Sequence, residues 1–239
     1  AILVMFSVVA FFGAFVSVPS VSAADSMTWN IYNIDTGNIT GVSIGYDIMS
    51  NGTLGVAYLN ANYVYYAESY DKGQTWNTEN LSVNGAFGKV ALAYNSTDVP
   101  FIIYADDADV LKLAYKSGGS WTNEVINSSH NLHYGIDLDF NSSDDAHPQI
   151  VFDDLTEHKI YHSYYSSGWQ TQAATGTLGS YVGGGLNIEV DGNEIWAMFL
   201  DCGGTNDLDV YHYDGSNWGA SREWYWDIGS SSHAAGMLK

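Results

Sequence analysis

Residues 69–76 read Ser-Tyr-Asp-Lys-Gly-Gln-Thr-Trp, and the tryptophan that ends this stretch belongs to a regular series. Tryptophans stand at positions 29, 76, 121, 169 and 218, so that successive members lie 47, 45, 48 and 49 residues apart. A fixed spacing of this kind is typical of chains built from one repeated structural unit. The series therefore predicts a fold assembled from units of about 47 residues.

Each interval between tryptophans reads as short strands separated by turns. In the first interval we expect strands over residues 42–49, 54–59 and 63–69, with Asn51-Gly52 as a two-residue hairpin turn. A fourth strand begins near each tryptophan, and four-stranded units repeated in this way are typical of a β-propeller. We therefore predict an all-β chain of four-stranded antiparallel blades, about four blades plus partial strands of a larger ring. The blades are expected at residues 41–84, 85–130, 131–178 and 179–229, with the start of a fifth at 230–239.

The N-terminal residues 1–24 are read separately from the propeller at 25–239. Residues 1–18 are almost entirely apolar, and Pro-Ser-Val-Ser-Ala at 19–23 places small residues as at a signal-peptidase site. We interpret 1–24 as a secretory signal peptide truncated at its start, with a retained membrane anchor as the alternative. Either reading predicts an exported protein, secreted or at the cell surface, and a membrane is a partner only if this segment is retained.

Six N-x-[ST] sequons agree with an exported glycoprotein. Asparagine is also favoured in turns whatever its glycosylation state, and at least three of the sequons fall where turns are expected. The sequons stand at Asn38, Asn51, Asn80, Asn95, Asn127 and Asn141.

The composition is strongly acidic, because 27 Asp and Glu against 7 Lys and Arg give a formal net charge of -20. Such a charge repels phosphate backbones, and no cluster of basic residues offsets it locally. Nucleic acid is therefore excluded as a partner. The single cysteine, Cys202, excludes an intramolecular disulfide and any site built from several thiolates, and the sequence predicts no cofactor.

The opening stretch matches the pattern S-x-D-x-G-x-T-W at every specified position, through Ser69, Asp71, Gly73, Thr75 and Trp76. The chain here resembles the sialidase-like Asp-box (BNR repeat) β-propellers, as architecture over residues 29–239. The motif implies a folding role. Asp71 accepts backbone N–H groups in the turn between the third and fourth strands, Gly73 permits a positive φ, and Trp76 packs between blades.

The resemblance does not extend to sialidase chemistry. That family binds the sialic acid carboxylate with three arginines, the first of them in an R-I-P sequence before a G-T-L turn. Here Asp47 stands where that arginine would be, Met49 takes the proline position, and Arg222 is the only arginine of the chain. An anionic sugar would meet an aspartate, so sialidase activity is not expected.

In related propellers the ligand-facing rim is formed by the starts of the first strands and by the loops that join the second and third strands. Transferred to this chain, that rim is acidic. Its carboxylates could coordinate calcium, hydrolyse a glycosidic bond as a pair about 5–10 Å apart, or cap turns on a soluble surface. The rim residues include Asp47, Lys89, Asp106, Asp107, Asp109, His133, Asp153, Asp154, His158, Tyr181, Asp201 and His233, together with Asn60-Ala61-Asn62.

The sequence thus predicts a secreted or cell-surface recognition module rather than an enzyme, with a glycan or a surface protein as its partner. The ligand-binding candidates are Asp47, Asp107, His133, Asp154 and Tyr181. The alternative is a glycoside hydrolase of sialidase-like architecture, and a third reading is a non-catalytic scaffold domain. The catalytic carboxylates of the hydrolase would come from Asp47, Asp106, Asp153 and Asp201.

Overall fold

The computed structural model describes residues 31–37, 39, 44–85, 89–178, 182–201, 207–220 and 224–227. The chain divides into two compact units, Ala1–Ile31 and Tyr32–Lys239, and all the described strands belong to the second. The predicted signal peptide, the predicted start of a fifth blade, Tyr181 and His233 lie outside the described residues. Within those residues no helix is long and apolar enough to cross a membrane.

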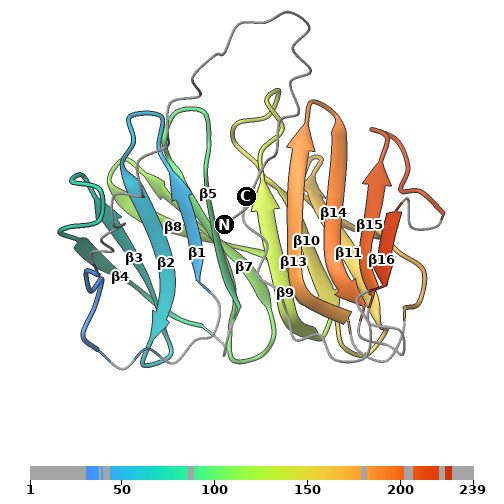
Figure 1. Cartoon of the computed structure of the whole chain (residues 1–239), viewed down its shortest axis with the longest axis horizontal. Coiled ribbons are helices and arrows are strands. Elements are labelled where there is room, and N and C mark those ends of the chain that lie inside the picture. The colour runs from blue at the N-terminus through green and yellow to red at the C-terminus, as the bar shows by residue number, and fades with distance from the viewer. Residues whose placement is uncertain are drawn as a thin grey trace, which may run out of the picture. The chain divides into compact units, whose positions relative to one another are not determined.

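The described strands form four sheets, each of four antiparallel strands that follow one another in chain order (Figure 1). The first blade consists of β1 (Gly45–Ile48), β2 (Leu54–Asn60), β3 (Tyr63–Ser69) and β4 (Asn77–Asn84). The second consists of β5 (Val90–Tyr94), β6 (Pro100–Ala105), β7 (Leu111–Ser117) and β8 (Ser120–Asn127). The third consists of β9 (Leu132–Asp139), β10 (Gln149–Asp154), β11 (Lys159–Tyr165) and β12 (Trp169–Ala173). The fourth consists of β13 (Val182–Asp191), β14 (Glu194–Asp201), β15 (Asp207–Tyr213) and β16 (Trp224–Asp227). The predicted four-stranded antiparallel blades are confirmed.

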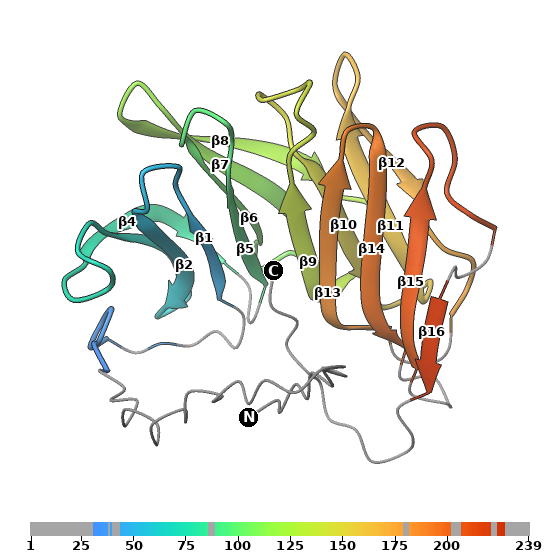
Figure 2. The ribbon, with the colours of Figure 1, turned by 45° about the horizontal axis from the view of Figure 1, so that its top comes forward.

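The four blades stand side by side with their first strands innermost (Figure 2). Strand β1 contacts β5, β5 contacts β9, and β9 contacts β13. This is the arrangement of a β-propeller. Among the described strands, a first strand pairs only with the second strand of its own blade, so one of its edges has no ladder partner there.

The core lies between the blades, so the middle strands are buried on both faces. Strand β6 is buried at every position. Ile102 and Tyr104 pack with the first blade, whereas Phe101, Ile103 and Ala105 pack with the third. Successive side chains of a strand point to opposite faces, so a strand covered on both sides is apolar throughout.

The repeated tryptophans fill the interfaces between blades. Trp121 packs edge-on against Tyr66 of the preceding blade at a ring-centroid distance of 5.4 Å, and its indole N–H donates to Glu79 at 3.0 Å. The indole of Trp169 donates in the same way to Glu124 of the preceding blade. The regular spacing of tryptophans therefore reflects one interface for each blade.

The turn Ser69–Trp76 joins β3 to β4 and folds around Asp71. Its carboxylate accepts the backbone N–H and the hydroxyl of Thr75 at 2.8 and 2.7 Å, and these bonds lower the pKa of Asp71 to about 2. Gly73 has a φ of 87°. The ring of Trp76 packs in an apolar cluster on one face of the first blade, the face away from the second blade. In the later blades, the equivalent face packs against the preceding blade.

Aspartates of the first strands bind the free strand edge of the next blade. Asp47 accepts the backbone N–H of Tyr94 at 2.8 Å, and Asp139 accepts that of Val190 at 2.9 Å. The two aspartates hold equivalent positions, since each also accepts the N–H of the residue that follows it. These carboxylates satisfy N–H groups that the ladder leaves without a partner.

The turns between first and second strands are linked from blade to blade as well. Asp98 of the second blade accepts the N–H and the hydroxyl of Ser50 in the first, each at 2.6 Å. Asp145 of the third blade binds Ser96 of the second in the same way, with both distances 2.7 Å. One aspartate of the second blade and one of the third thus hold a turn of the preceding blade.

Five sequon asparagines lie in the described residues, and each side chain bonds back to the local backbone. In all five the side-chain oxygen accepts the backbone N–H two residues further along, which is the geometry of an Asx-turn. The five are Asn51, Asn80, Asn95, Asn127 and Asn141. Asn51, Asn95 and Asn141 lie in turns between strands, as predicted for at least three of the sequons, whereas Asn80 and Asn127 belong to β4 and β8.

Replacing an interface tryptophan tests the blade packing. Trp169→Ala removes an aromatic ring between the second and third blades, and we expect the free energy of unfolding to fall by about 3 kcal/mol. Urea unfolding followed by fluorescence measures the change. The control Tyr70→Ala, at a ring that is 65% exposed, should change stability by less than about 0.5 kcal/mol. Equal losses in the two variants would contradict the assigned role.

Candidate functional site

The predicted rim contains aspartates that hold its own loops in place. Asp106 follows β6 and accepts the backbone N–H groups of Ala108 and Val110 at 2.9 and 3.0 Å. Its other oxygen pairs with the Lys112 ammonium at 2.7 Å. Both oxygens of this catalytic candidate are therefore engaged in shaping the loop between β6 and β7.

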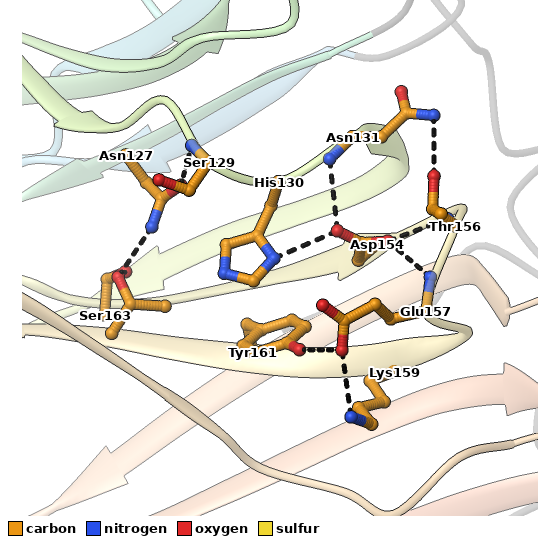
Figure 3. Close-up of polar contacts among 11 residues, drawn as sticks. Asn127, Ser129, His130, Asn131, Asp154, Thr156, Glu157, Lys159, Tyr161 and Ser163 are labelled. Atoms are coloured by element: carbon orange, nitrogen blue, oxygen red, sulfur yellow. Dashed lines mark hydrogen bonds and ion pairs between the residues drawn. The ribbon is translucent and has the colours of Figure 1, made fainter.

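Asp154 does the same work in the third blade (Figure 3). One oxygen accepts the backbone N–H groups of Thr156 and Glu157, each at 2.7 Å, and the other accepts from His130 Nδ1 and the Asn131 N–H. Burial by itself would raise the pKa of Asp154, but these hydrogen bonds, led by that of Glu157, hold it below the usual range. Asp154 was predicted to bind ligand, but its four bonds engage both oxygens.

His130 is packed as well as hydrogen-bonded. Its ring lies 3.9 Å from that of Tyr161, centroid to centroid. The Tyr161 hydroxyl donates to Glu157 at 2.6 Å, and the Lys159 ammonium donates to the same oxygen at 2.9 Å (Figure 3). The network in Figure 3 therefore fixes the loop between β10 and β11.

The packing shows which rim positions correspond between blades. Phe152 and Tyr104 both face the preceding blade, so Asp153 corresponds to Ala105 and Asp154 to Asp106. The sequence had grouped Asp153 with Asp106 as the residue that follows a second strand. The structure corrects this by one position, because β10 continues through Asp154.

Asp153 consequently lies inside the protein, with 1% of its surface exposed. One oxygen accepts the Gly135 N–H at 3.0 Å. The other oxygen, Oδ2, lies 3.3 Å from Nδ1 of His133 but has no partner in hydrogen-bond geometry among the described residues. Burial raises the pKa of this carboxyl. The structure thus brings together Asp153 and His133, two of the predicted rim residues.

Lys89 is a further buried charge of the rim. Its ammonium pairs with Asp109 at 2.6 Å and also donates to the backbone oxygen of Leu132, next to His133. The lysine therefore has partners already and is not a spare cation for an acidic ligand.

The remaining candidates are dispersed. Asp47 pairs in register with Gly55 near the turn between β1 and β2, at the edge opposite the rim, so its placement in the rim was wrong. Asp107 is exposed in the loop between β6 and β7, and Asp201 ends β14 opposite Asp207. In the described part of the chain no three His, Cys, Asp or Glu side chains are grouped to hold a metal ion.

A groove with a volume of 620 Å³ opens between β4 of the first blade and β6, β7 and β8 of the second. Two irregularities shape it. The pairing of β4 slips between Tyr63 and Tyr65, where Ser82 has a φ of 58°, and the pairing of β8 slips beside Lys112. Such bulges redirect side chains at strand edges. The lining includes Val83, Asn84, Asp107, Lys112, Asn123 and Val125.

Sequence reasoning missed most of this groove, because Asn84, Asn123 and Val125 lie in outer strands rather than in rim loops. One signal was present. The sequon at Asn80 places turn-forming chemistry inside a predicted strand, and Ser82 N–H bonds back to the Asn80 side chain at 2.7 Å. A turn residue within a strand indicates a bulge.

His162, one of the scattered histidines, lies between the third and fourth blades. Its Nδ1 accepts from Trp218 Nε1 at 3.3 Å and from Gln172 Nε2 at 3.2 Å. Nε2 therefore carries the proton and donates to Gln149 Oε1 at 2.8 Å. Burial of this neutral ring lowers the pKa of His162 to about 4.

No protein-family model matches the chain, and no curated protein matches it. Solved structures do. The BP39L lectin from Burkholderia pseudomallei aligns with a TM-score of 0.64 at 16% identity, over 82% of this chain and 60% of that one. A lectin of Aleuria aurantia, described as a six-bladed β-propeller, aligns with a TM-score of 0.57 at 11% identity, over 80% and 64%.

An exo-β-1,3-galactanase from Phanerochaete chrysosporium is also similar, with a TM-score of 0.52 at 12% identity, over 82% of this chain and 52% of that one. The chain spans 60–67% of the length of the lectins that it matches. At these identities the likeness shows the β-propeller fold.

His162 should make the protein sensitive to mild acid. In the unfolded chain this histidine binds a proton below its ordinary pKa of 6.5, whereas the folded protein resists protonation until about 4. Stability is therefore present above pH 6.5 and is lost as the pH falls toward 4, by up to about 3 kcal/mol. Urea unfolding at pH 7, 5.5 and 4 measures the slope, which His162→Gln should flatten. An unchanged slope in that variant would contradict the assignment.

Proposed function

We propose that this protein is a recognition module that binds a glycan, and not an enzyme. The observation that carries the proposal is the groove of 620 Å³ between the first two blades, which is within the range of small-molecule sites. The likeness to lectins supports it. One of them was solved with α-methyl fucoside and another with Fucα1-6GlcNAc.

The lining of the groove suits a neutral sugar. Asn84, Asn123 and Asp107 offer amide and carboxylate groups for hydroxyls, and Val83 and Val125 offer apolar surface for the C–H face of a ring. The one lysine of the groove, Lys112, is already paired with Asp106. With a net charge of -20, the protein should disfavour acidic sugars.

The hydrolase alternative is less well supported. A glycosidase needs two carboxyl groups placed on either side of the scissile bond. Among its four candidates, Asp47 binds the Tyr94 N–H and Asp106 is bonded to its own loop and to Lys112. The contacts of these two carboxylates therefore favour a structural role.

The proposal includes kinship with the Asp-box propellers and a location outside the cell. The bonds of Asp71 in the Ser69–Trp76 turn support the first. The apolar residues 1–18 and their small-residue boundary support the second. A surface glycan, or a protein that carries one, would then be the partner.

A glycan array in the presence and absence of calcium tests the function. We expect retention of neutral, fucose-bearing glycans without release of cleaved product. Asp107→Ala and Asn84→Ala should each weaken binding by about tenfold, since each removes a hydrogen-bonding group from the groove. Asp191→Asn, at an exposed turn on the opposite edge, is the matched control and should bind like the wild type.

Product release that depends on a rim carboxylate would replace this proposal with the hydrolase. Absence of both retention and cleavage would favour a scaffold domain.

A further inference from the structure

The interfaces between the four described blades differ in charge at one repeated position. In the first interface, Glu79 of the first blade accepts the indole N–H of Trp121 and pairs with the Lys116 ammonium at 2.6 Å. That ammonium lies 5.9 Å from the ring centroid of Tyr66 and 5.7 Å from that of Trp121. One carboxylate and two aromatic rings thus hold an ammonium group, by ion pairing and by cation–π attraction.

The second interface, between the second and third blades, lacks this cation. Lys116 pairs in register with Trp121. Tyr165 pairs in the same way with Trp169, so it takes the position of the lysine in the third blade. An uncharged side chain therefore stands where the first interface has its ammonium.

The second interface keeps the carboxylate, as Glu124, which like Glu79 stands three residues after the tryptophan of its own blade. One oxygen accepts the Tyr115 hydroxyl at 3.0 Å and the other the Trp169 indole N–H at 3.3 Å. Both donors are neutral, each oxygen can accept a second bond, and no cation of the described residues pairs with this carboxylate. In the third interface the corresponding residue is the neutral Gln172. The second interface thus carries a charge that the first pairs and the third omits.

A pocket with a volume of 360 Å³ opens beside Glu124, between the second blade and the turn that joins β9 to β10. Its wall on the second blade includes Tyr115, whose ring stacks on Phe101 at a centroid distance of 5.2 Å. Its wall on the third blade includes His147, whose ring stacks on Tyr165 at 3.7 Å. The pocket is therefore large enough for a small molecule and has aromatic walls beside a carboxylate.

We propose that this pocket binds a primary ammonium group on an apolar stem, with Glu124 as its counterion. The Lys116 side chain, an ammonium at the end of an alkyl chain, shows that the matching position of the first interface takes such a group. Asp145 also lines the pocket, and the net charge of -20 favours a cation over an acid. Lys116 borders the pocket too, but its ammonium is bound to Glu79 on the opposite face of the blade.

NMR titration of the full chain with n-butylamine, which carries the alkylammonium group of a lysine side chain, tests the pocket at pH 7.5. We expect the indole N–H resonance of Trp169 to shift, because this indole donates to Glu124. The resonance of Trp121 should stay in place, because Lys116 already occupies its interface. 1-Butanol, which has the same stem without the charge, should bind about tenfold more weakly.

Two variants remove the free carboxylate charge in different ways. Glu124→Gln should weaken n-butylamine binding about tenfold, and Gln172 shows that the fold accepts glutamine at this position. Tyr165→Lys should block the amine as well, because it supplies the missing lysine from the chain itself. Asp191→Asn, which removes the same charge from an exposed turn, is the matched control and should bind like the wild type.

Equal binding of 1-butanol, or unchanged n-butylamine binding in Glu124→Gln, would overturn the ammonium site. Equal shifts of Trp169 and Trp121 would overturn it too, since they would indicate unspecific attraction to an acidic surface. Glu124 also borders the sugar groove, but its side chain points away from the groove, toward Trp169. Because pocket and groove lie on opposite faces of the second blade, failure of amine binding would leave the glycan proposal intact, and the reverse.

Discussion

Each blade of this protein depends on its neighbours, because its two faces and the free edge of its first strand are satisfied only across an interface. The apolar side chains of β6 need both adjoining blades for burial. The unpaired N–H groups of Tyr94 and Val190 find acceptors in carboxylates of the preceding blade. Each blade thus makes the same kinds of apolar contact and hydrogen bond to the next blade. One residue pattern recurs along the chain because every interface needs the same contacts.

The sequence was sufficient for the blades because their strands obey simple rules. Apolar runs, two-residue turns and one interface tryptophan per repeat are each set by local geometry, and Trp121 and Trp169 occupy the interfaces that their spacing suggested. The site was harder to predict. Strand β10 continues through Asp154, and its pairing with β9 slips between Phe152 and Asp154. Asp153 therefore points into the protein and Asp154 into the loop, and no sequence pattern shows which of two adjacent aspartates turns inward.

Many of the aspartates stabilise the fold, although the sequence had suggested that several of them form a ligand-binding rim. Asp106 and Asp154 close their own loops, Asp47 and Asp139 bind neighbouring strands, and Asp98 secures a turn of the blade before it. Carboxylates accept several N–H groups at once, so aspartate is suited to ending strands in a fold with many turns. Asp153 stands apart because it is almost completely buried, beside His133, instead of closing a loop.

The turns closed by sequon asparagines affect how the protein can be engineered. Substituting glutamine for asparagine, the usual way to remove an attached sugar, would move the amide by one methylene and break the bond that closes the turn. At Asn95 it would also break the contact between the side-chain nitrogen and Asp145 of the next blade. Changing the hydroxyl residue of a sequon leaves the turn-closing bond in place where only a backbone N–H makes it, as at Asn51 and Asn127. At those two sequons the third position of the motif, not the first, is the one to alter.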